Sequence, residues 1–448
     1  MKRTIYSLFY ILTFLFVLCS CSKQPTSDSL TLPNALKVIV KEDHRAPVVL
    51  VEVWYKVGSS YEPSGLTGIS HVLEHLMFEG SRHYPKDAYT KLVSANGGSL
   101  NAATSFDYTF YYNELAANKL ALAFALEADR MEHLNITPAS FAKEIKIVKE
   151  ERRMRTDDNP MGLTAERFNA AAFISSPYHH APIGWMSDLN SMIFNDVKQW
   201  YKQWYAPNNA IVVVVGDVHP ELVFKLAKKY FGNIPRRTLP VLKSPADQSQ
   251  LGSKEIIVNV PAQLPLIKMG YNVPTLPNAK QACEPYALEI LSAVFAGDKS
   301  SRLQQEFVRK LQIASNVEVD YDLDSRLPRL FVFNAIPTQG QSLEKLKQAI
   351  ISAVQQVQNN LISEDELNRI KNQVIADKIF AKDSLETQAN EIGSFEVLGL
   401  GADEIEHYVK AIEQVTPEQV QAVAKKYLVN NRLTIAYLIP KKMGSKEQ

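Results

Sequence analysis

One local pattern occurs twice in this chain, and it constrains the fold more than any other feature. Near residue 200, "VKQWYKQWYAPNNAIVVVVGDV" has the pattern of a helix, a Pro-Asn turn and a buried strand. Near the C-terminus, "VQAVAKKYLVNNRLTIAYLIP" repeats that order. Because the chain has 448 residues, it is also too long for one ordinary hydrophobic core. The sequence therefore predicts two halves of common design.

Composition divides the chain further. A polar segment with Pro and Ser separates the two halves, and a short segment rich in Ser, Thr, Pro and Gln precedes the first. The predicted segments are a signal peptide (1–20), a tether (21–35), an N-terminal domain (36–235), a linker (236–254) and a related C-terminal domain (255–441).

The N-terminus has the pattern of an export signal. Two basic residues precede the apolar run "IYSLFYILTFLFVL", which is short for a membrane span. Leu18 stands three residues before Cys21, which resembles the lipobox of bacterial lipoproteins, so Cys21 is the predicted lipidation site. Neither Ser22 nor Lys23 is the aspartate of an inner-membrane retention signal, which favours the periplasmic side of the outer membrane. A plain secretory signal or an uncleaved anchor are the alternatives.

Charge and cysteine content limit the remaining possibilities. The formal net charge is +1, without a basic field that would favour nucleic acid. After removal of the signal peptide, Cys283 is the one cysteine besides the lipidation site, so we expect no internal disulfide.

The stretch "GISHVLEHLMFEGS" carries the chemistry. On a helix, His71 and His75 are one turn apart and point the same way, with Glu74 beside them. Two imidazoles at this spacing can bind one ion, and zinc accepts nitrogen and carboxylate ligands. A catalytic zinc site usually has three protein ligands and an open fourth position for water. Glu74 is therefore the predicted general base.

A third ligand is expected from the helix predicted between residues 139 and 155. Its apolar face is formed by Phe141, Ile145 and Val148, and at about 100° per residue Glu144 and Glu151 flank that face. Glu151 is the better ligand. Glu144, two turns earlier on the same side, is assigned to the catalytic residues as the group that supports a ligand.

The chain between these helices predicts a strand and another helix. "NGGSLNAATSFDYTFYY" alternates with period two over residues 106–112, which indicates a strand, and residues 113–134 have a helical pattern. An edge strand can bind an extended peptide through its main chain. An ordinary structural strand is the alternative.

These residues resemble the inverted-motif zinc peptidases of the pitrilysin, insulin-degrading enzyme and mitochondrial processing peptidase family. The resemblance extends over nearly the whole mature chain and includes "SPYHHAPIGW". In that family the third ligand stands some 76 residues after the second histidine and seven after another functional glutamate, and both spacings select Glu151. The resemblance also implies that Asn101 and Ala102 line the substrate.

For the fold, we therefore expect an α+β protein of two structurally related domains. Each should be a mainly antiparallel sheet packed with helices, and the domains should face each other across a cleft. One zinc ion per chain is expected.

The resemblance fails at one place in the second half. The family has an arginine and, seven residues later, a tyrosine that hold the substrate opposite the zinc. The matching positions here are Val308 and Ser315, which supply neither a guanidinium nor a phenol, and Arg309 and Tyr321 are out of register. Since short-chain members can separate these roles, a related partner subunit that carries the Arg/Tyr pair is expected.

The predicted function is that of a zinc-dependent endopeptidase that hydrolyses peptides or unfolded segments in the cleft and needs a partner subunit. The alternative is a non-catalytic scaffold subunit of a membrane-associated complex, which loss of a ligand or of Glu74 would favour. A binding module with a structural zinc is a third possibility, and it requires a closed fourth coordination position.

Overall fold

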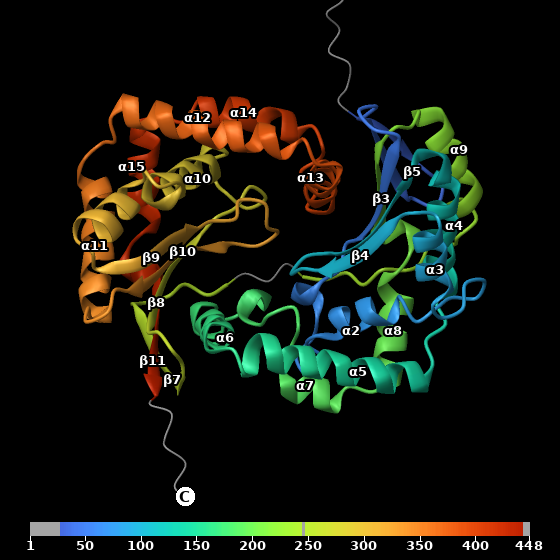
Figure 1. Cartoon of the computed structure of the whole chain (residues 1–448), viewed down its shortest axis with the longest axis horizontal. Helices are drawn as coiled ribbons and strands as arrows, with labels where there is room; N and C mark the ends of the chain where they lie inside the picture. The colour runs from blue at the N-terminus through green and yellow to red at the C-terminus, as the bar shows by residue number, and fades with distance from the viewer. Residues whose placement is uncertain (1–26, 244–246, 442–448) are drawn as a thin grey trace, which may run out of the picture.

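The computed structural model describes residues 27–243 and 247–441. These residues form two sheets, one in each half of the chain, and Figure 1 shows the halves side by side. The predicted signal peptide and Cys21 lie outside the described residues. Within the described part of the chain, no helix is long and apolar enough to span a membrane.

The first half contains a six-stranded sheet with the order β1-β2-β6-β3-β5-β4. Its strands are β1 (Asp28–Thr31), β2 (Lys37–Glu42), β3 (Val48–Tyr55), β4 (Ser99–Thr104), β5 (Thr109–Ala116) and β6 (Ala210–Gly216). Its helices are α2 (Ile69–Leu76), α3 (Ala88–Ala95), α4 (Leu120–His133), α5 (Pro138–Arg152), α6 (Pro160–Ala172), α7 (Met186–Ser191), α8 (Phe194–Trp204) and α9 (Pro220–Phe231).

The second half contains a five-stranded sheet with the order β7-β11-β8-β10-β9. Its strands are β7 (Lys254–Pro261), β8 (Leu266–Val273), β9 (Ala314–Asp320), β10 (Arg329–Pro337) and β11 (Leu433–Lys441). Its helices are α10 (Cys283–Ala296), α11 (Leu343–Asn359), α12 (Glu364–Ala381), α13 (Leu385–Val397), α14 (Glu404–Glu413) and α15 (Pro417–Tyr427).

The two halves have the same design, as the repeated sequence pattern predicts. That pattern forms α8 and β6 in the first half and α15 and β11 in the second. β6 pairs in parallel with β2 and antiparallel with β3, and β11 pairs in parallel with β7 and antiparallel with β8. The other pairings are antiparallel. The predicted α+β class with two related, mainly antiparallel sheets is confirmed.

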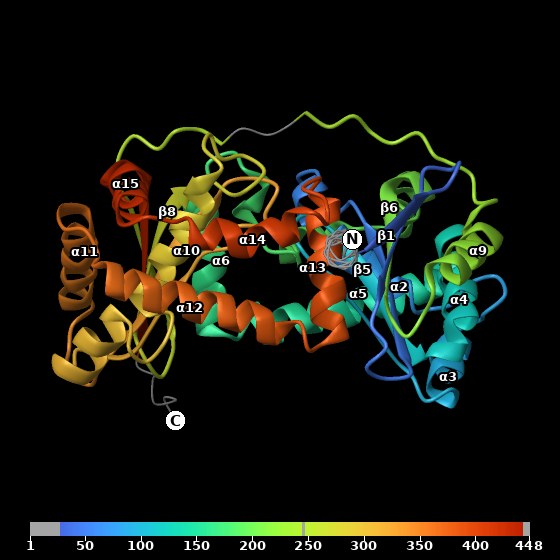
Figure 2. The same ribbon diagram turned by 90° about the horizontal axis from the view of Figure 1, so that it is seen from above.

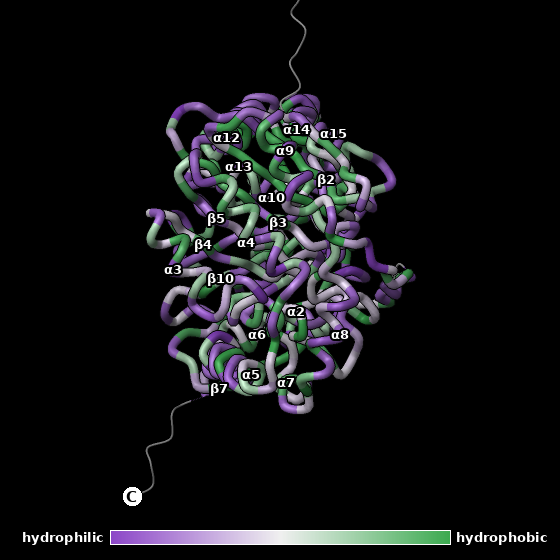
Figure 3. Tube along the Cα trace, turned by 90° about the vertical axis from the view of Figure 1, so that its right-hand side faces the viewer, coloured by the Kyte–Doolittle hydropathy of each residue, from purple (hydrophilic) through white to green (hydrophobic). Residues whose placement is uncertain are grey.

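Each sheet is buried on both faces, which explains the continuous apolar run in β6. Val212 and Val214 point to the helices of their own half, whereas Ile211, Val213 and Val215 point to the opposite face. Alternate residues of a strand face opposite sides, so a strand buried on both sides must be apolar throughout. Figure 3 shows the hydrophobic segments gathered inside the molecule and hydrophilic ones around its outline.

The second face of each sheet is covered by a helix from the other half. Helix α13 packs on β3 and β6 of the first sheet, where Gly393 lies against Trp54. Helix α6 packs on β7, β8 and β11 of the second sheet, where Phe168 lies against Gly270. In Figures 1 and 2 these helices lie between the two sheets. Each half keeps a hydrophobic core of its own, and α13 and α6 add two further clusters that the halves share.

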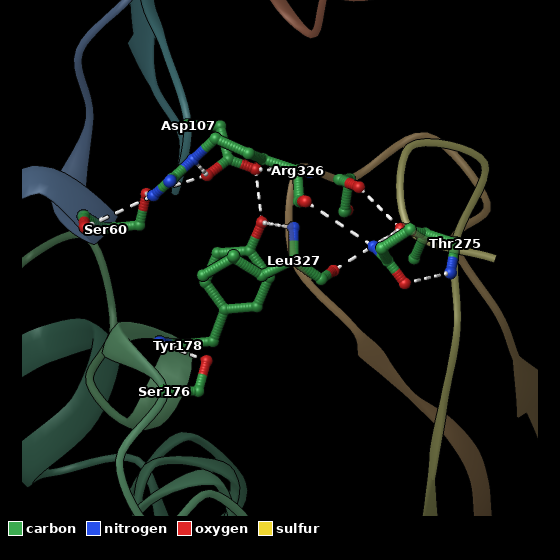
Figure 4. A network of polar contacts seen from close by, with 9 residues as sticks. Ser60, Asp107, Ser176, Tyr178, Thr275, Arg326 and Leu327 are labelled. Atoms are coloured by element: carbon green, nitrogen blue, oxygen red, sulfur yellow. Dashed lines mark hydrogen bonds and ion pairs between the residues drawn. The ribbon is translucent and has the colours of Figure 1, made fainter. Parts of the chain in front are cut away.

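A polar network joins the two halves at a second place (Figure 4). Asp107, in the connection between β4 and β5, accepts hydrogen bonds from the Arg326 backbone N–H at 3.0 Å and from the Arg326 Nε at 3.2 Å. Ser60 donates to the same carboxylate at 2.7 Å, and Tyr178 also donates to it. Arg326 lies in the connection between β9 and β10, so equivalent connections of the two halves meet here.

Two local predictions differ from the structure. Residues 28–31, assigned to the tether, form β1, which pairs antiparallel with β2, and Leu30 packs against the core of the first half. Residues 113–116, assigned to the start of a helix, continue strand β5, because Asn113 is buried and hydrogen-bonded to Glu127 at 2.6 Å. Between α9 and β7, the described residues 232–243 and 247–253 contain no helix or strand. Figure 2 shows them above the two halves.

Candidate metal centre and active site

Helix α2 places the three motif residues on one face. Ile69, Val72 and Leu76 are buried in the core, so His71, Glu74 and His75 point to the opposite, half-buried side. The N-cap residue of this helix is Gly68, whose φ of 87° lies in the left-handed region that glycine tolerates. Glu62 fixes this end by accepting hydrogen bonds from the backbone N–H groups of Gly68 at 2.7 Å and Ser70 at 2.8 Å.

Helix α5 brings the two glutamates to the same place. Thr137 caps its N-terminus by accepting a hydrogen bond from the Ser140 N–H, and Pro138 occupies the first turn. Phe141, Ile145 and Val148 are buried, as the helical pattern predicts. The α-helix ends at Arg152 and continues as a wider turn through Arg153–Asp157.

The three predicted ligands converge. The Glu151 Oε2 lies 3.4 Å from the His75 Nε2 and 3.7 Å from the His71 Nε2. One potential ligand atom from each residue lies within 4.8 Å of the other two. Atoms bonded to one zinc ion at about 2.0–2.2 Å in a tetrahedron are about 3.3–3.6 Å apart. The spacing and the N₂O donor set therefore fit a zinc ion.

The pKa shifts of two of the three ligands favour metal binding, whereas the hydrogen bond with Glu151 raises the pKa of His75 despite its burial. Burial lowers the pKa of His71 to about 4, although the nearby Glu151 carboxylate partly opposes this shift. The hydrogen bond from His75 lowers the pKa of Glu151, outweighing burial. Neutral imidazole and ionised carboxylate are the forms that bind metal. Glu144 Oε2 lies 3.3 Å from the His75 Nδ1, where it can orient that imidazole as predicted for a supporting group.

Glu74 points to the same side as the ligands. Thr104 Oγ1 donates a 2.5 Å hydrogen bond to the Glu74 Oε2. Burial raises the pKa of this carboxyl. A carboxylate held through one oxygen keeps the other available for proton transfer.

A cavity of about 590 Å³ opens beside these groups. It is lined by all three candidate ligands, Glu74 and Arg155, and by residues 101–104 of β4. β4 is the last strand of its sheet, so it has an open edge. The strand predicted at residues 106–112 corresponds instead to β5, which begins at Thr109 and is paired on both sides. Asn101 and Ala102 therefore lie at the cavity on the edge strand.

Several contacts of the site were not predicted from the sequence. Thr104 was missed, although it stands two residues after Ala102 on the same strand and therefore faces the same side of the sheet. Lys143 bridges Glu144 at 2.9 Å and Glu79 at 3.1 Å. Arg155 lies 3.0 Å from the Glu151 Oε1, four residues away along the chain.

The two positions that lack the family's Arg/Tyr pair lie in the second half. Val308 lies in the turn Gln304–Lys310, and Ser315 lies on β9, where its hydroxyl donates to the Ile336 carbonyl at 3.2 Å. Arg309 is exposed. Tyr321 donates to the Pro274 carbonyl at 2.6 Å, so its hydroxyl is already engaged.

Comparison with known proteins identifies the family. Residues 37–182 match insulinase (peptidase family M16), and residues 191–374 match the peptidase M16 inactive domain. A relative from Helicobacter pylori, "Zinc protease PqqE", is 32% identical over 431 residues, which cover 93% of each chain. The chain belongs to the peptidase M16 family. The predicted family is thus confirmed.

Other M16 relatives and solved structures agree. An uncharacterised zinc protease of Mycobacterium bovis is 28% identical over 413 residues, covering 92% of each chain. The crystal structure of a protease from Helicobacter pylori has a TM-score of 0.87 and 32% identity, covering 93% of this chain and 100% of that one. The periplasmic protease PqqL from Escherichia coli shares the fold, with a TM-score of 0.80 and 17% identity, covering 94% of this chain and 48% of that one.

Proposed function

We propose that this M16 chain is a zinc-dependent endopeptidase that hydrolyses peptides or unfolded segments. The observation that carries the proposal is the convergence of His71, His75 and Glu151 beside Glu74 in one cavity. One catalytic zinc ion, bound by those three side chains, would polarise the scissile carbonyl and make water a stronger nucleophile.

The residues of the chain supply the remaining chemistry. One Glu74 oxygen is held by Thr104, and the other accepts a proton from the attacking water and passes it to the leaving amine. Glu144 orients His75 through its Nδ1. Burial of these groups keeps bulk water from weakening their interactions.

The substrate is proposed to bind as an added strand at the open edge of β4. Asn101 and Ala102 offer backbone groups there, next to the candidate ligands. Main-chain pairing recognises an extended peptide with little regard to its sequence. Most backbone N–H and C=O groups of a folded protein are already paired within it, so the proposed substrates are peptides and unfolded segments.

Metal removal tests the proposed function. The zinc-loaded chain should hydrolyse an extended fluorogenic peptide, lose this activity after chelation, and recover it when zinc is returned. A folded chain with one zinc at His71, His75 and Glu151 that cleaves no peptide, alone or with a related subunit, would instead support a scaffold role.

We further propose that full activity needs a related subunit that carries the missing Arg/Tyr pair. Support comes from Val308 and Ser315, which lack the donors expected at those positions. The purified chain should be weakly active, and a co-expressed related subunit should raise kcat/KM. Strong hydrolysis by a verified monomer would refute this requirement.

For location, we propose the periplasmic side of the bacterial outer membrane, with a lipid on Cys21. The support is the pattern of the first 21 residues, an apolar run followed by the lipobox-like sequence. Mass spectrometry of the mature N-terminus, compared between the chain and its Cys21→Ser variant, tests the anchor.

A further inference from the structure

A second group of metal-binding side chains lies outside the candidate active site. His83 lies in the loop that follows α2, while Asp129 and His133 are four residues apart on α4. One potential ligand atom from each of the three lies within 4.8 Å of the other two. They line a cavity of about 240 Å³ together with Glu132.

Asp129 is held in a fixed orientation. Its Oδ2 accepts hydrogen bonds from the Ser81 hydroxyl and, at 3.0 Å, from the His83 backbone N–H. Its Oδ1 is directed to the imidazoles, 2.6 Å from the His83 Nδ1 and 3.3 Å from the His133 Nδ1. One carboxylate oxygen is thus anchored by the protein, and the other is presented together with two imidazole nitrogens.

The spacing is close to that of a tetrahedral metal site. Two ligand atoms of one zinc ion are about 3.3–3.6 Å apart. The distance between the Asp129 Oδ1 and the His133 Nδ1 already lies in this range. The distance between the Asp129 Oδ1 and the His83 Nδ1 must lengthen by less than about 1 Å. His83 can make this adjustment because its side chain is 63% exposed. Two imidazoles and one carboxylate are a donor set that suits zinc and similar divalent transition metals.

A comparable group on the same half lacks these features. Glu42, His44 and His219 also place ligand atoms within 4.8 Å of one another. All three are exposed. No buried carboxylate anchors that group, so it serves as the internal comparison.

We propose that His83, Asp129 and His133 form a second binding site for a divalent transition metal, with zinc as its expected occupant. The ion would tie the loop after α2 to the end of α4. That loop includes Glu79, which reaches Glu144 through Lys143, so its position bears on the surroundings of His75.

Metal stoichiometry tests the second site. The purified chain is stripped with a chelator, loaded with Zn²⁺, passed through a desalting column and analysed for zinc per chain. We expect two ions in the wild-type chain, one in the His71→Ala/His75→Ala variant and one in the His83→Ala/His133→Ala variant. His219→Ala is the matched control and should retain two.

A second measurement keeps the test independent of folding. In the His71→Ala/His75→Ala background, Zn²⁺ should raise Tm, and the single change His83→Ala, at an exposed side chain, should weaken Zn²⁺ binding by at least about tenfold. No ion in the His71→Ala/His75→Ala variant, two in the His83→Ala/His133→Ala variant, or loss of the second ion in His219→Ala would each overturn the proposal. None of these results depends on peptide hydrolysis.

Discussion

Equivalent pockets in the two halves of the molecule have different chemistry. In the first half, α2, β4 and α5 surround the candidate metal centre. In the second half, the elements at the same places in chain order, α10, β9 and α12, line a larger cavity of about 810 Å³. No histidine is among the described residues that line the second cavity, which instead contains Glu289, Lys268 and Lys378.

The comparison separates what the shared fold provides from what the side chains provide. The fold supplies a pocket between a helix, an edge strand and a second helix in both halves. Of these two pockets, the first alone has histidines beside its glutamates, on the facing helices α2 and α5. Function is therefore a property of the site and not of the architecture.

The largest expected effect tests whether catalysis belongs to the first pocket alone. Glu74→Gln should retain zinc but lower peptide hydrolysis by about 10²–10⁴-fold, because the general base is removed while the ligands remain. The matched change in the second pocket, Glu289→Gln, should leave kcat/KM within about twofold. Zinc analysis and a peptide assay measure both. Full activity in Glu74→Gln would remove the assigned role.

The next effect concerns the network between the halves. Asp107→Ala leaves Arg326, Ser60 and Tyr178 without their shared acceptor. The free energy of unfolding should therefore fall by about 3–5 kcal/mol. Glu306→Ala, which removes an exposed pair with Lys310 inside one half, should cost less than about 1 kcal/mol. Urea unfolding curves provide the comparison. Equal midpoints for the two variants would show that the network contributes no stability.

The two halves also contain buried groups with opposite pKa shifts. Burial lowers the pKa of His180 to about 4, and burial raises the pKa of Glu289 to about 7 despite the hydrogen bond from Tyr408. As pH falls from 6.5 to 4, the unfolded chain takes up a proton at His180 that the folded chain refuses, so stability is lost. As pH rises from 4.5 to 7, Glu289 loses its proton only in the unfolded chain, so stability is again lost.

Between pH 4.5 and 6.5 these two effects oppose each other in the wild-type chain. His180→Gln removes the contribution that rises with pH, so its free energy of unfolding should fall more steeply with rising pH than that of wild type. Glu289→Gln removes the contribution that falls with pH, so its free energy of unfolding should rise with pH relative to wild type. Each difference should reach at most about 3 kcal/mol. Urea unfolding at several pH values measures both slopes. Parallel pH profiles in all three proteins would contradict the shifts.

The smallest effect compares the two helices that cross between the halves. An added Cβ at Gly393 would lie 2.1 Å from the Trp54 Cε2, and one at Gly270 would lie 2.5 Å from the Phe168 Cζ. Both alanine variants should be destabilised by about 1–3 kcal/mol through overpacking. Gly393→Ala should be affected more, because the contact is closer. Gly252→Ala is the control, because an added Cβ there would have no atom within 4 Å. Equal Tm values for the three variants in a thermal scan would show that neither interface is tightly packed.

Local patterns predicted much of the candidate site. His71, Glu74 and His75 fall on one helical face because their spacing matches one turn, and the apolar positions of α5 place Glu144 and Glu151 beside its buried face. The family spacing then selected Glu151. Thr104 and Lys143 were missed because each owes its role to a residue on another element.

The sequence by itself determined the repeated design, the mainly antiparallel α+β class and the candidate zinc ligands, since these depend on periodicity and spacing along the chain. Only the tertiary structure decided that α6 covers the second sheet and α13 the first. It also decided that Asp107 contacts Arg326 and that His83 lies beside Asp129 and His133. These contacts join segments distant in the sequence, and their geometry follows from how whole sheets and helices pack.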